Sequence, residues 1–401
     1  MKRIAVWMAV LITLCGLMFG AALAQGAQRS GPELSDEQKQ AFQQLAPGVE
    51  ITPELIELMQ DITYNPDMSI DARLRAIGRL SGLDRLPEDQ RMSTTICIWD
   101  PAGRAGPIFT AAEEQRIRAA EYGLQINMVP YTNESVMVDE LLSARCDAAL
   151  MTGLRARQFN KFTGTVDAIG ALPTDEHMRI LLEVLKHPSN AGRMVDGEYV
   201  VLGVFPAGAA HIFVNDREIN TLGKAAGKRV VVLDYDPMQA QMVAGLGATP
   251  VQADITRAPG MFNNGVVDVL AAPLVAYEAL ELYRGLDPDG GIIDYPLTQL
   301  SMQLIGRRAK FPNEIAQLIR EATHEAYDDI MAFLNREAER VPARWWIEIP
   351  HADRLEYELM MEDARVELRN LGYYDGEMLQ LQRRIRCRMA PDRSECSDPR
   401  E

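Results

Sequence analysis

The segment of residues 213–273 constrains the fold most, because apolar strands and helices alternate within it. An apolar strand over residues 228–233 precedes a helix that ends at Gly245, and a short strand over residues 249–252 follows. A second helix then leads to a strand over residues 266–271. Because strands that alternate with helices form parallel sheets, this pattern predicts an α/β unit.

A second alternation of strands and helices precedes this unit, and together they predict a doubly wound sheet with right-handed crossovers. The mature chain of about 377 residues is long enough for two such lobes with additional helices. The expected elements are strand 94–99, helix 111–122, strand 124–130, helix 135–144, strand 147–152, interlobe strands 198–205 and 209–214, an extended return over 292–307, one long helix from Pro312 to about Asn335, and helices 353–371 and 376–387.

We expect five segments along the chain. They are a signal peptide (1–24), a helical N-terminal extension (25–92), lobe 1 (93–198 with 292–330), lobe 2 (199–291), and C-terminal helices with a disulfide-closed tail (331–401). Within the extension, capping signals at Ser35 and at Thr52 before Pro53 each predict a helix start, and residues 71–80 predict a third helix.

The N-terminus indicates export. Lys2 and Arg3 precede an uncharged run over residues 4–23, and small residues at Ala22 and Ala24 suit a signal peptidase. We therefore predict cleavage after Ala24 and a periplasmic location. The uncharged run is also long enough to span a bilayer, so an uncleaved anchor is the alternative.

The chain is acidic, with a formal charge of −16, which argues against nucleic acid or anionic lipid as a partner. Four cysteines follow the leader, an even number that predicts two disulfides in an exported protein. Neighbouring parallel strands would bring Cys97 and Cys146 together, and Cys387–Cys396 would close a short loop. Zinc is the competing interpretation, but the cysteine and histidine spacing does not support it.

Polar and aromatic residues gather where the predicted strands end, which is where open α/β sheets bind ligands. Arginines there can bind a carboxylate or phosphate through bidentate hydrogen bonds, and aromatic rings can line a pocket with flat apolar surfaces. Aspartates can bind an amine or neutralise the arginines. Single members also have structural interpretations, such as a turn at Asp100 and a helix cap at Asn133. The candidate ligand-binding residues are Trp99, Asp100, Arg104, Tyr131, Asn133, Thr152, Arg155, Arg157, Asp234, Tyr235, Asp236, Asn264, Pro273 and Tyr277.

Four pieces of the predicted second lobe resemble TRAP-type extracytoplasmic solute receptors, in which they recur in the same order. They are residues 213–215, 227–230, 246–251 and 264–268. Longer motifs are similar to the RND-efflux-associated solute-binding proteins, a family that itself resembles the TRAP receptors. These motifs are residues 96–107, 131–134, 146–165, 214–220, 231–236, 262–273, 384–387 and 395–396.

The resemblance implies a two-lobe, periplasmic-binding-protein-like fold of type II. One departure affects the ligand. TRAP receptors of organic acids usually hold the ligand carboxylate with an arginine at the position of Val231, and Arg229 lies roughly 6–7 Å away along the strand. Either Arg155 or Arg157 takes over that role, or the ligand is not an acid.

We expect a periplasmic protein that captures a small molecule between its lobes, in a TRAP-like or efflux-associated transport system with membrane subunits as partners. The alternative is a non-transporting envelope scaffold that binds a protein. An enzyme is not expected, because the five histidines lack metal-ligand spacing and nucleophile-elbow and phosphate-loop motifs are absent from the sequence. No cofactor is predicted, and both a monomer and a homodimer remain open.

Overall fold

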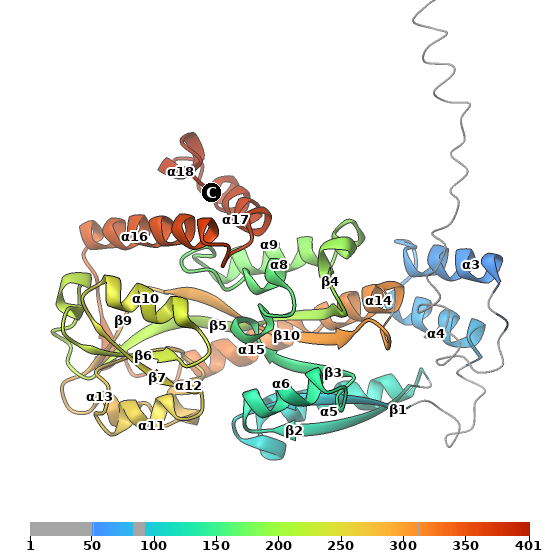
Figure 1. The fold of residues 1–401 in the computed structure, drawn as a ribbon, viewed down its shortest axis with the longest axis horizontal. Helices are drawn as coiled ribbons and strands as arrows, with labels where there is room; N and C mark the ends of the chain where they lie inside the picture. Colours follow the sequence, from blue (N-terminus) through green and yellow to red (C-terminus); the bar gives the residue numbers. More distant parts are fainter. Residues whose placement is uncertain (1–49, 51, 83–92, 123, 312) are drawn as a thin grey trace, which may run out of the picture.

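One long strand, β5, runs through both halves of a mixed sheet and joins them (Figure 1). The computed structural model describes residues 50, 52–82, 93–122, 124–311 and 313–401. Within these residues eleven strands form one sheet, with the main order β2-β1-β3-β10-β5-β8-β6-β7. We call β2-β1-β3 with its helices lobe 1, and β8-β6-β7 with its helices lobe 2.

Strands within each lobe are parallel, whereas β10 and β5 run antiparallel to their neighbours. Both lobes therefore turn the carboxyl ends of their strands towards the middle of the molecule. The strands are β1 (Ser93–Trp99), β2 (Gln125–Tyr131), β3 (Ala148–Thr152), β4 (Val195–Asp196), β5 (Tyr199–Val214), β6 (Arg229–Leu233), β7 (Thr249–Ala253), β8 (Val269–Pro273), β9 (Gly291–Ile293), β10 (Thr298–Arg307) and β11 (Trp346–Ile347).

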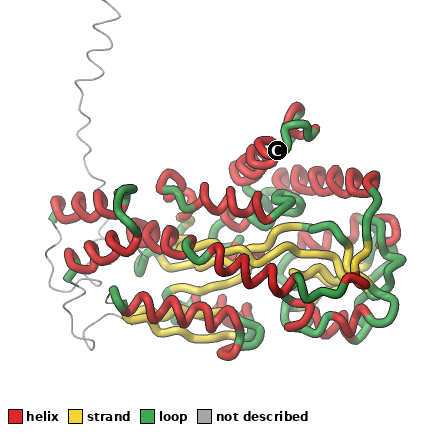
Figure 2. Tube along the Cα trace, turned by 180° about the vertical axis from the view of Figure 1, so that it is seen from behind, coloured by secondary structure: helices red, strands yellow, loops and turns green. Residues whose placement is uncertain are grey.

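Helices cover both faces of the sheet (Figure 2). The α-helices are α3 (Pro53–Thr63), α4 (Ile70–Leu80), α5 (Pro107–Ala120), α6 (Glu134–Leu142), α7 (Gly153–Ala156), α8 (Lys161–Gly164), α9 (Asp175–Leu185), α10 (Pro237–Gly245), α11 (Ala258–Asn263), α12 (Ala276–Ala279), α13 (Tyr283–Leu286), α14 (Asn313–His324), α15 (Tyr327–Ala338), α16 (His351–Asn370), α17 (Gly376–Met389) and α18 (Ser394–Ser397).

Two expectations about the middle of the molecule were wrong in detail. The two predicted interlobe strands are one strand, because the ladder with β10 skips Ala207 and absorbs it as a bulge. The predicted long helix from Pro312 is two helices, α14 and α15, separated at Glu325 and Ala326. The amides of both residues bond to carbonyls three residues earlier, which tightens the chain into a turn between the helices.

The described part of the helical N-terminal extension, α3 and α4, packs against α14 beside lobe 1. Thr52 caps α3 as predicted, since its hydroxyl accepts a hydrogen bond from the Leu55 amide. Met59 of α3 and Ile77 of α4 form a small core with Leu318 of α14. The predicted helix at Ser35 and the export signal lie outside the described residues, and no described helix has the length and apolarity to cross a membrane.

The C-terminal helices form a hairpin that touches both lobes. Tyr357 and Met361 of α16 pack in the lobe 2 cluster with Val269, whereas α17 packs against α9 of lobe 1. Both predicted disulfides, Cys97–Cys146 and Cys387–Cys396, are present.

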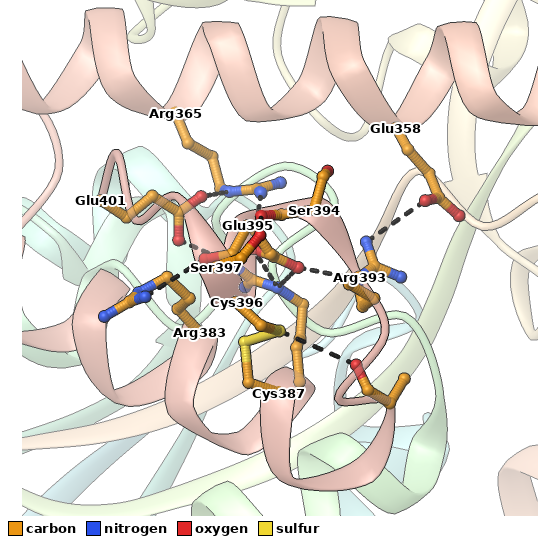
Figure 3. The surroundings of a disulfide bond; sticks show 12 residues. Glu358, Arg365, Arg383, Cys387, Arg393, Ser394, Glu395, Cys396, Ser397 and Glu401 are labelled. Atoms are coloured by element: carbon orange, nitrogen blue, oxygen red, sulfur yellow. Dashed lines mark hydrogen bonds and ion pairs between the residues drawn. A yellow bond between two sulfur atoms is a disulfide. The ribbon is translucent and has the colours of Figure 1, made fainter.

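The C-terminal tail is held by buried ion pairs, and Figure 3 shows Glu395 and Glu401 beneath Arg365 of α16. Arg386 of α17 donates to Glu395 at 2.5 Å, to Glu401 at 2.7 Å and to the Ala171 carbonyl at 2.7 Å. The tail therefore fixes α17 to α16 and to lobe 1 at once.

Candidate functional site

The loop after β3 in lobe 1 faces the loop after β6 in lobe 2, as the strand-end argument predicts. The guanidinium Cζ of Arg155 lies 3.5 Å from the ring centroid of Tyr235. Arg157 Nη1 lies 3.7 Å from Asp236 Oδ2. Two arginines of one lobe thus meet two predicted site residues of the other lobe, and the groove between these loops is the candidate ligand-binding cleft.

Arg155 is held from the lobe 1 side by a buried carboxylate. Its Nε lies 3.8 Å from Glu134 Oε2, while Glu134 Oε1 accepts a hydrogen bond of 2.7 Å from the Thr152 amide. Burial raises the pKa of Glu134, and the Thr152 amide and Arg155 oppose that rise. Thr152 also caps α7 through its hydroxyl, which accepts from the Arg155 amide. Glu134 therefore compensates the charge of Arg155.

Arg157 is held by the second lobe and the C-terminal hairpin. Its Nε donates to the Gly164 carbonyl at 3.0 Å, and its Nη1 donates to the hydroxyl of Tyr373, between α16 and α17. The Tyr373 hydroxyl in turn donates to Asp236 Oδ2 at 2.5 Å. Burial raises the pKa of Asp236, whereas the charge of Arg157 lowers it. Tyr373 was not predicted, because it lies far along the chain from the loops it joins.

A buried polar group beside the cleft also escaped prediction. Asp167 is 3% exposed, and its Oδ1 accepts a 2.5 Å hydrogen bond from the Ser301 hydroxyl of β10. Gln303 of β10 donates to Ser301 at 3.2 Å and to the Thr163 carbonyl at 2.8 Å. Burial raises the pKa of Asp167 to about 7. Ser301 and Gln303 are two residues apart on one strand face, which is a sequence signal within an otherwise apolar strand.

Glycine at position 153 allows this group to form. A Cβ at that position would overlap both Ser301 Oγ and Asp167 Oδ2. Gly153 therefore lets the β3 end approach the Asp167 carboxylate closely, and any larger residue would push the two apart.

Several buried polar atoms around the cleft have no hydrogen-bond partner in the described chain. A buried polar group left unpaired costs about 1–3 kcal/mol, so native proteins rarely leave such atoms together. Donors and acceptors are both represented, which suits a ligand that carries both. The atoms are Trp99 Nε1, Glu134 Oε2, Arg155 Nε, Asp167 Oδ2 and Gln303 Oε1.

The cleft opens into a cavity of about 1890 Å³. This volume exceeds that of a single small-molecule pocket, because the cavity continues along α5, α14 and α16. Most of the lining near the cleft is apolar, and its polar side chains include Thr152, Arg157, Asp167 and Ser301. The lining there includes Trp99, Thr152, Leu154, Arg157, Asp167, Phe205, Leu233, Ile255, Ala272, Pro273 and Ser301.

Three predicted site residues have hydrogen-bond partners within the protein, and their contact with a ligand stays a prediction. The Asp100 carboxylate accepts hydrogen bonds from the amides of Ala102, Ile108 and Phe109, so it shapes the turn and caps α5. Asn133 caps α6 by accepting from the Val136 amide. The Tyr277 hydroxyl accepts from Trp345 Nε1 at 2.8 Å within the core of lobe 2.

The remaining predictions divide between the cleft and the surface. Trp99 and Tyr131 end adjacent strands and pack on the lobe 1 core, while Pro273 ends β8 in the cavity wall. Asp234 is exposed, and Arg104 is exposed with its guanidinium over the Phe109 ring. Asn264 is exposed before the start of β8, at the end of the strand away from the cleft.

At the position where TRAP receptors of organic acids usually have an arginine, this chain has Val231, and its surroundings are apolar. Val231 packs against the lobe 2 core, and Arg229 pairs with Asp268 at 2.6 Å near the start of β6. Arg229 therefore does not reach the cleft.

The two-lobe sheet with its central cleft defines a type II solute-binding fold. Residues 111–401 match the family described as "Solute-binding protein AdeT 1/2", and the chain belongs to that family. It is 37% identical over 300 residues to the probable solute-binding protein AdeT1 of Acinetobacter baumannii, covering 75% of this chain and 99% of the relative. Identity to AdeT2 of the same organism is 26% over 233 residues, covering 58% and 98%.

Solved structures with this fold are TRAP periplasmic solute-binding proteins. One from Ralstonia eutropha H16, with bound (S)-2-acetolactate, superposes with a TM-score of 0.60 at 12% identity, covering 74% of this chain and 99% of that one. One from Haemophilus influenzae, with bound L-gulonate, gives a TM-score of 0.59 at 12% identity, covering 73% and 99%. At such identities the likeness establishes the fold.

Proposed function

We propose that this protein is a periplasmic receptor that binds one small organic solute in the cleft between its lobes. The observation that carries the proposal is a large, mostly apolar cavity whose wall includes two residues with unpaired buried polar atoms, Trp99 and Asp167. A solute with a polar end could pair with these atoms, and its apolar part would bury against the cavity wall. Binding would thereby offset the energetic cost of leaving these buried polar atoms unpaired.

The periplasmic location rests on the predicted signal peptide, on the two disulfides and on the periplasmic structural neighbours. Within the periplasm, delivery to membrane transporter subunits, TRAP-like or efflux-associated, is the expected use of a captured solute. Catalysis is not part of the proposal, since the relatives are solute-binding proteins and the polar groups are suited to holding a molecule.

A thermal-shift screen of organic acids, sugars, amines and neutral aromatics tests the receptor function. A solute at one hundred times its dissociation constant adds about 2.7 kcal/mol to the free energy of unfolding, which is readily detected. Leu154→Trp fills the cleft without changing charge, because Leu154 lines the cavity on the lobe 1 side. Leu142→Trp is the matched control, since Leu142 is exposed on α6 of the same lobe.

We expect a compound that stabilises the wild type and the Leu142→Trp variant but not the Leu154→Trp variant. If no compound stabilises the wild type, the receptor function fails and the scaffold alternative gains support. If the Leu154→Trp variant responds like the wild type, the solute binds elsewhere and the cleft assignment fails.

A further inference from the structure

We propose that the solute is an organic amine with an apolar body, and that the Asp167 carboxylate is its counter-ion. This inference rests on the proposed receptor function and specifies the chemistry of the same cleft. The charged groups that face the cleft differ in whether they already have a partner of opposite charge within the protein.

Both cleft arginines are already compensated. Glu134 lies beside Arg155, and Asp236 lies beside Arg157. Arg157 also donates to a carbonyl and to the hydroxyl of Tyr373. An organic acid would have to displace these carboxylates and would then face both of them across a short distance, which like-charge repulsion disfavours. Arg155 and Arg157 therefore each already lie beside a carboxylate of the protein.

Asp167 is a buried carboxyl group in the cavity wall whose charge has no such partner among the described residues. It forms no ion pair within the described ranges, and its one side-chain hydrogen bond comes from the neutral Ser301 hydroxyl. Burial has the largest effect on the pKa of Asp167 and raises it, while the side-chain and backbone hydrogen bonds from Ser301 and, least, the charge of Arg157 lower it. Because a buried carboxylate needs a charged partner or several donors to remain ionised, a cationic ligand would supply what the protein does not.

The geometry around Asp167 also fits an ammonium group. Its Oδ2 has no hydrogen-bond partner in the described chain, and Asp167 lines the cavity, so this acceptor could pair with a donor group of the ligand. An ammonium group carries only donors, whereas a carboxylate carries only acceptors. Gly153 has no side chain to cover the Asp167 carboxylate, which lies in the cavity wall.

The walls favour an apolar and aromatic body on the amine. Trp99, Leu154 and Phe205 line the cleft, and aromatic faces attract cations as well as apolar groups. Sugars and small hydroxy acids would leave this surface without complementary contacts. We therefore expect affinity to rise with the apolar area of the amine.

Matched probe sets test this inference. Each set places an amine, an alcohol and a carboxylate on one aromatic framework, for example 2-phenylethylamine, 2-phenylethanol and 3-phenylpropionate, with larger frameworks alongside. Binding to the mature protein is measured by calorimetry. The test variant is Asp167→Asn, which keeps the size of the side chain, and the control is Asp139→Asn at an exposed position on α6.

We expect amines to bind most tightly, and Asp167→Asn to weaken amine binding at least about tenfold while alcohol binding changes little. Asp139→Asn should leave both unchanged. Because the Asp167 pKa is raised to about 7, amine binding to the wild type at neutral pH should also release protons. Calorimetry in two buffers of different ionisation enthalpy detects this release without any variant.

Three results would overturn the inference. Carboxylates or alcohols that bind more tightly than their matched amines would overturn it and leave the receptor function standing. Amine binding without proton release, or unaffected by Asp167→Asn, would remove Asp167 from the site. No binding by any probe or by any compound of the wider screen would overturn the receptor function as well.

Discussion

The guanidinium of Arg155 lies over the ring of Tyr235, with Cζ 3.5 Å from the ring centroid, and this contact joins lobe 1 to lobe 2. Arg155 is nearly buried, with 12% of its side chain exposed. Together with the contact between Arg157 and Asp236, it holds the strand-end loops of the two lobes against each other. The structure therefore represents a closed arrangement of the cleft.

A double-mutant cycle measures the strength of that interlobe contact. Arg155→Met removes the cation and Tyr235→Leu removes the ring. Because the pair is largely desolvated, we expect a coupling energy of roughly 1–2 kcal/mol in the free energy of unfolding. Arg155→Met should cost more than Tyr235→Leu, since it also leaves Glu134 buried without its cation. A coupling energy near zero would show that this contact does not hold the lobes together in solution.

The buried tail predicts a large stability effect far from the cleft. Arg386→Met would remove a buried cation that pairs with both Glu395 and Glu401, while Arg365 and Arg393 stay beside them, and this loss should cost about 3 kcal/mol of unfolding free energy. Arg179→Met is the control, because its pair with Glu176 is solvent-exposed and should contribute far less. Urea unfolding measures the stability of both variants, and we expect a lower midpoint for Arg386→Met than for Arg179→Met. Equal midpoints would contradict the stabilising role of the tail.

Asp167 predicts a specific pH dependence of stability. Its folded pKa is about 7, above the ordinary value of 3.8, so the folded protein binds more protons than the unfolded chain between these pH values. The contribution of Asp167 to the free energy of unfolding should therefore be greatest at low pH and should decline as pH rises from about 4 to about 7. Buried His177 has its pKa lowered to about 4 by burial and by nearby Arg386, and therefore acts in the opposite sense.

Comparison with Asp167→Asn isolates the contribution of Asp167, because the effect of His177 is common to both proteins. The unfolding free energy of the wild type minus that of the variant should fall as pH rises through this range. A difference that is flat from pH 4 to pH 8 would mean that Asp167 is not held in a buried, uncompensated position.

The two disulfides should differ in their effect on stability. Cys97–Cys146 closes a loop with a sequence separation of 49 and Cys387–Cys396 one with a separation of 9. Chain entropy then predicts contributions of about 4 and about 3 kcal/mol respectively. We expect the double alanine variant of the first pair to unfold at lower urea than that of the second. The reverse order would indicate that the tail disulfide also maintains the buried ion pairs around Glu395.

Much of the fold could be predicted because its signals are local. Alternating strands and helices, the cap at Thr52 and the cysteine positions all act over short stretches of sequence. The break between α14 and α15 could not be predicted, because no glycine or proline marks it. Likewise, the bulge at Ala207 depends on the register of two distant strands.

The candidate site could be predicted from the sequence only for residues that directly follow a strand, because the sheet topology fixes where those residues lie. Arg155, Arg157 and Tyr235 follow parallel strands, so topology alone brings them together. Asp167 lies in a stretch without clear periodicity, and its environment comes from β10, which is more than one hundred residues away. Asp100 and Asn133 have the residue types of binding groups, but local backbone amides satisfy them first.

A crystal structure of the mature protein with the most stabilising compound of the screen tests the central claim most directly. We predict electron density for the compound between the loops after β3 and β6, with one of its donor atoms within about 3.2 Å of Asp167 Oδ2. A cleft filled by the protein's own side chains, or a compound bound at another surface, would contradict the account.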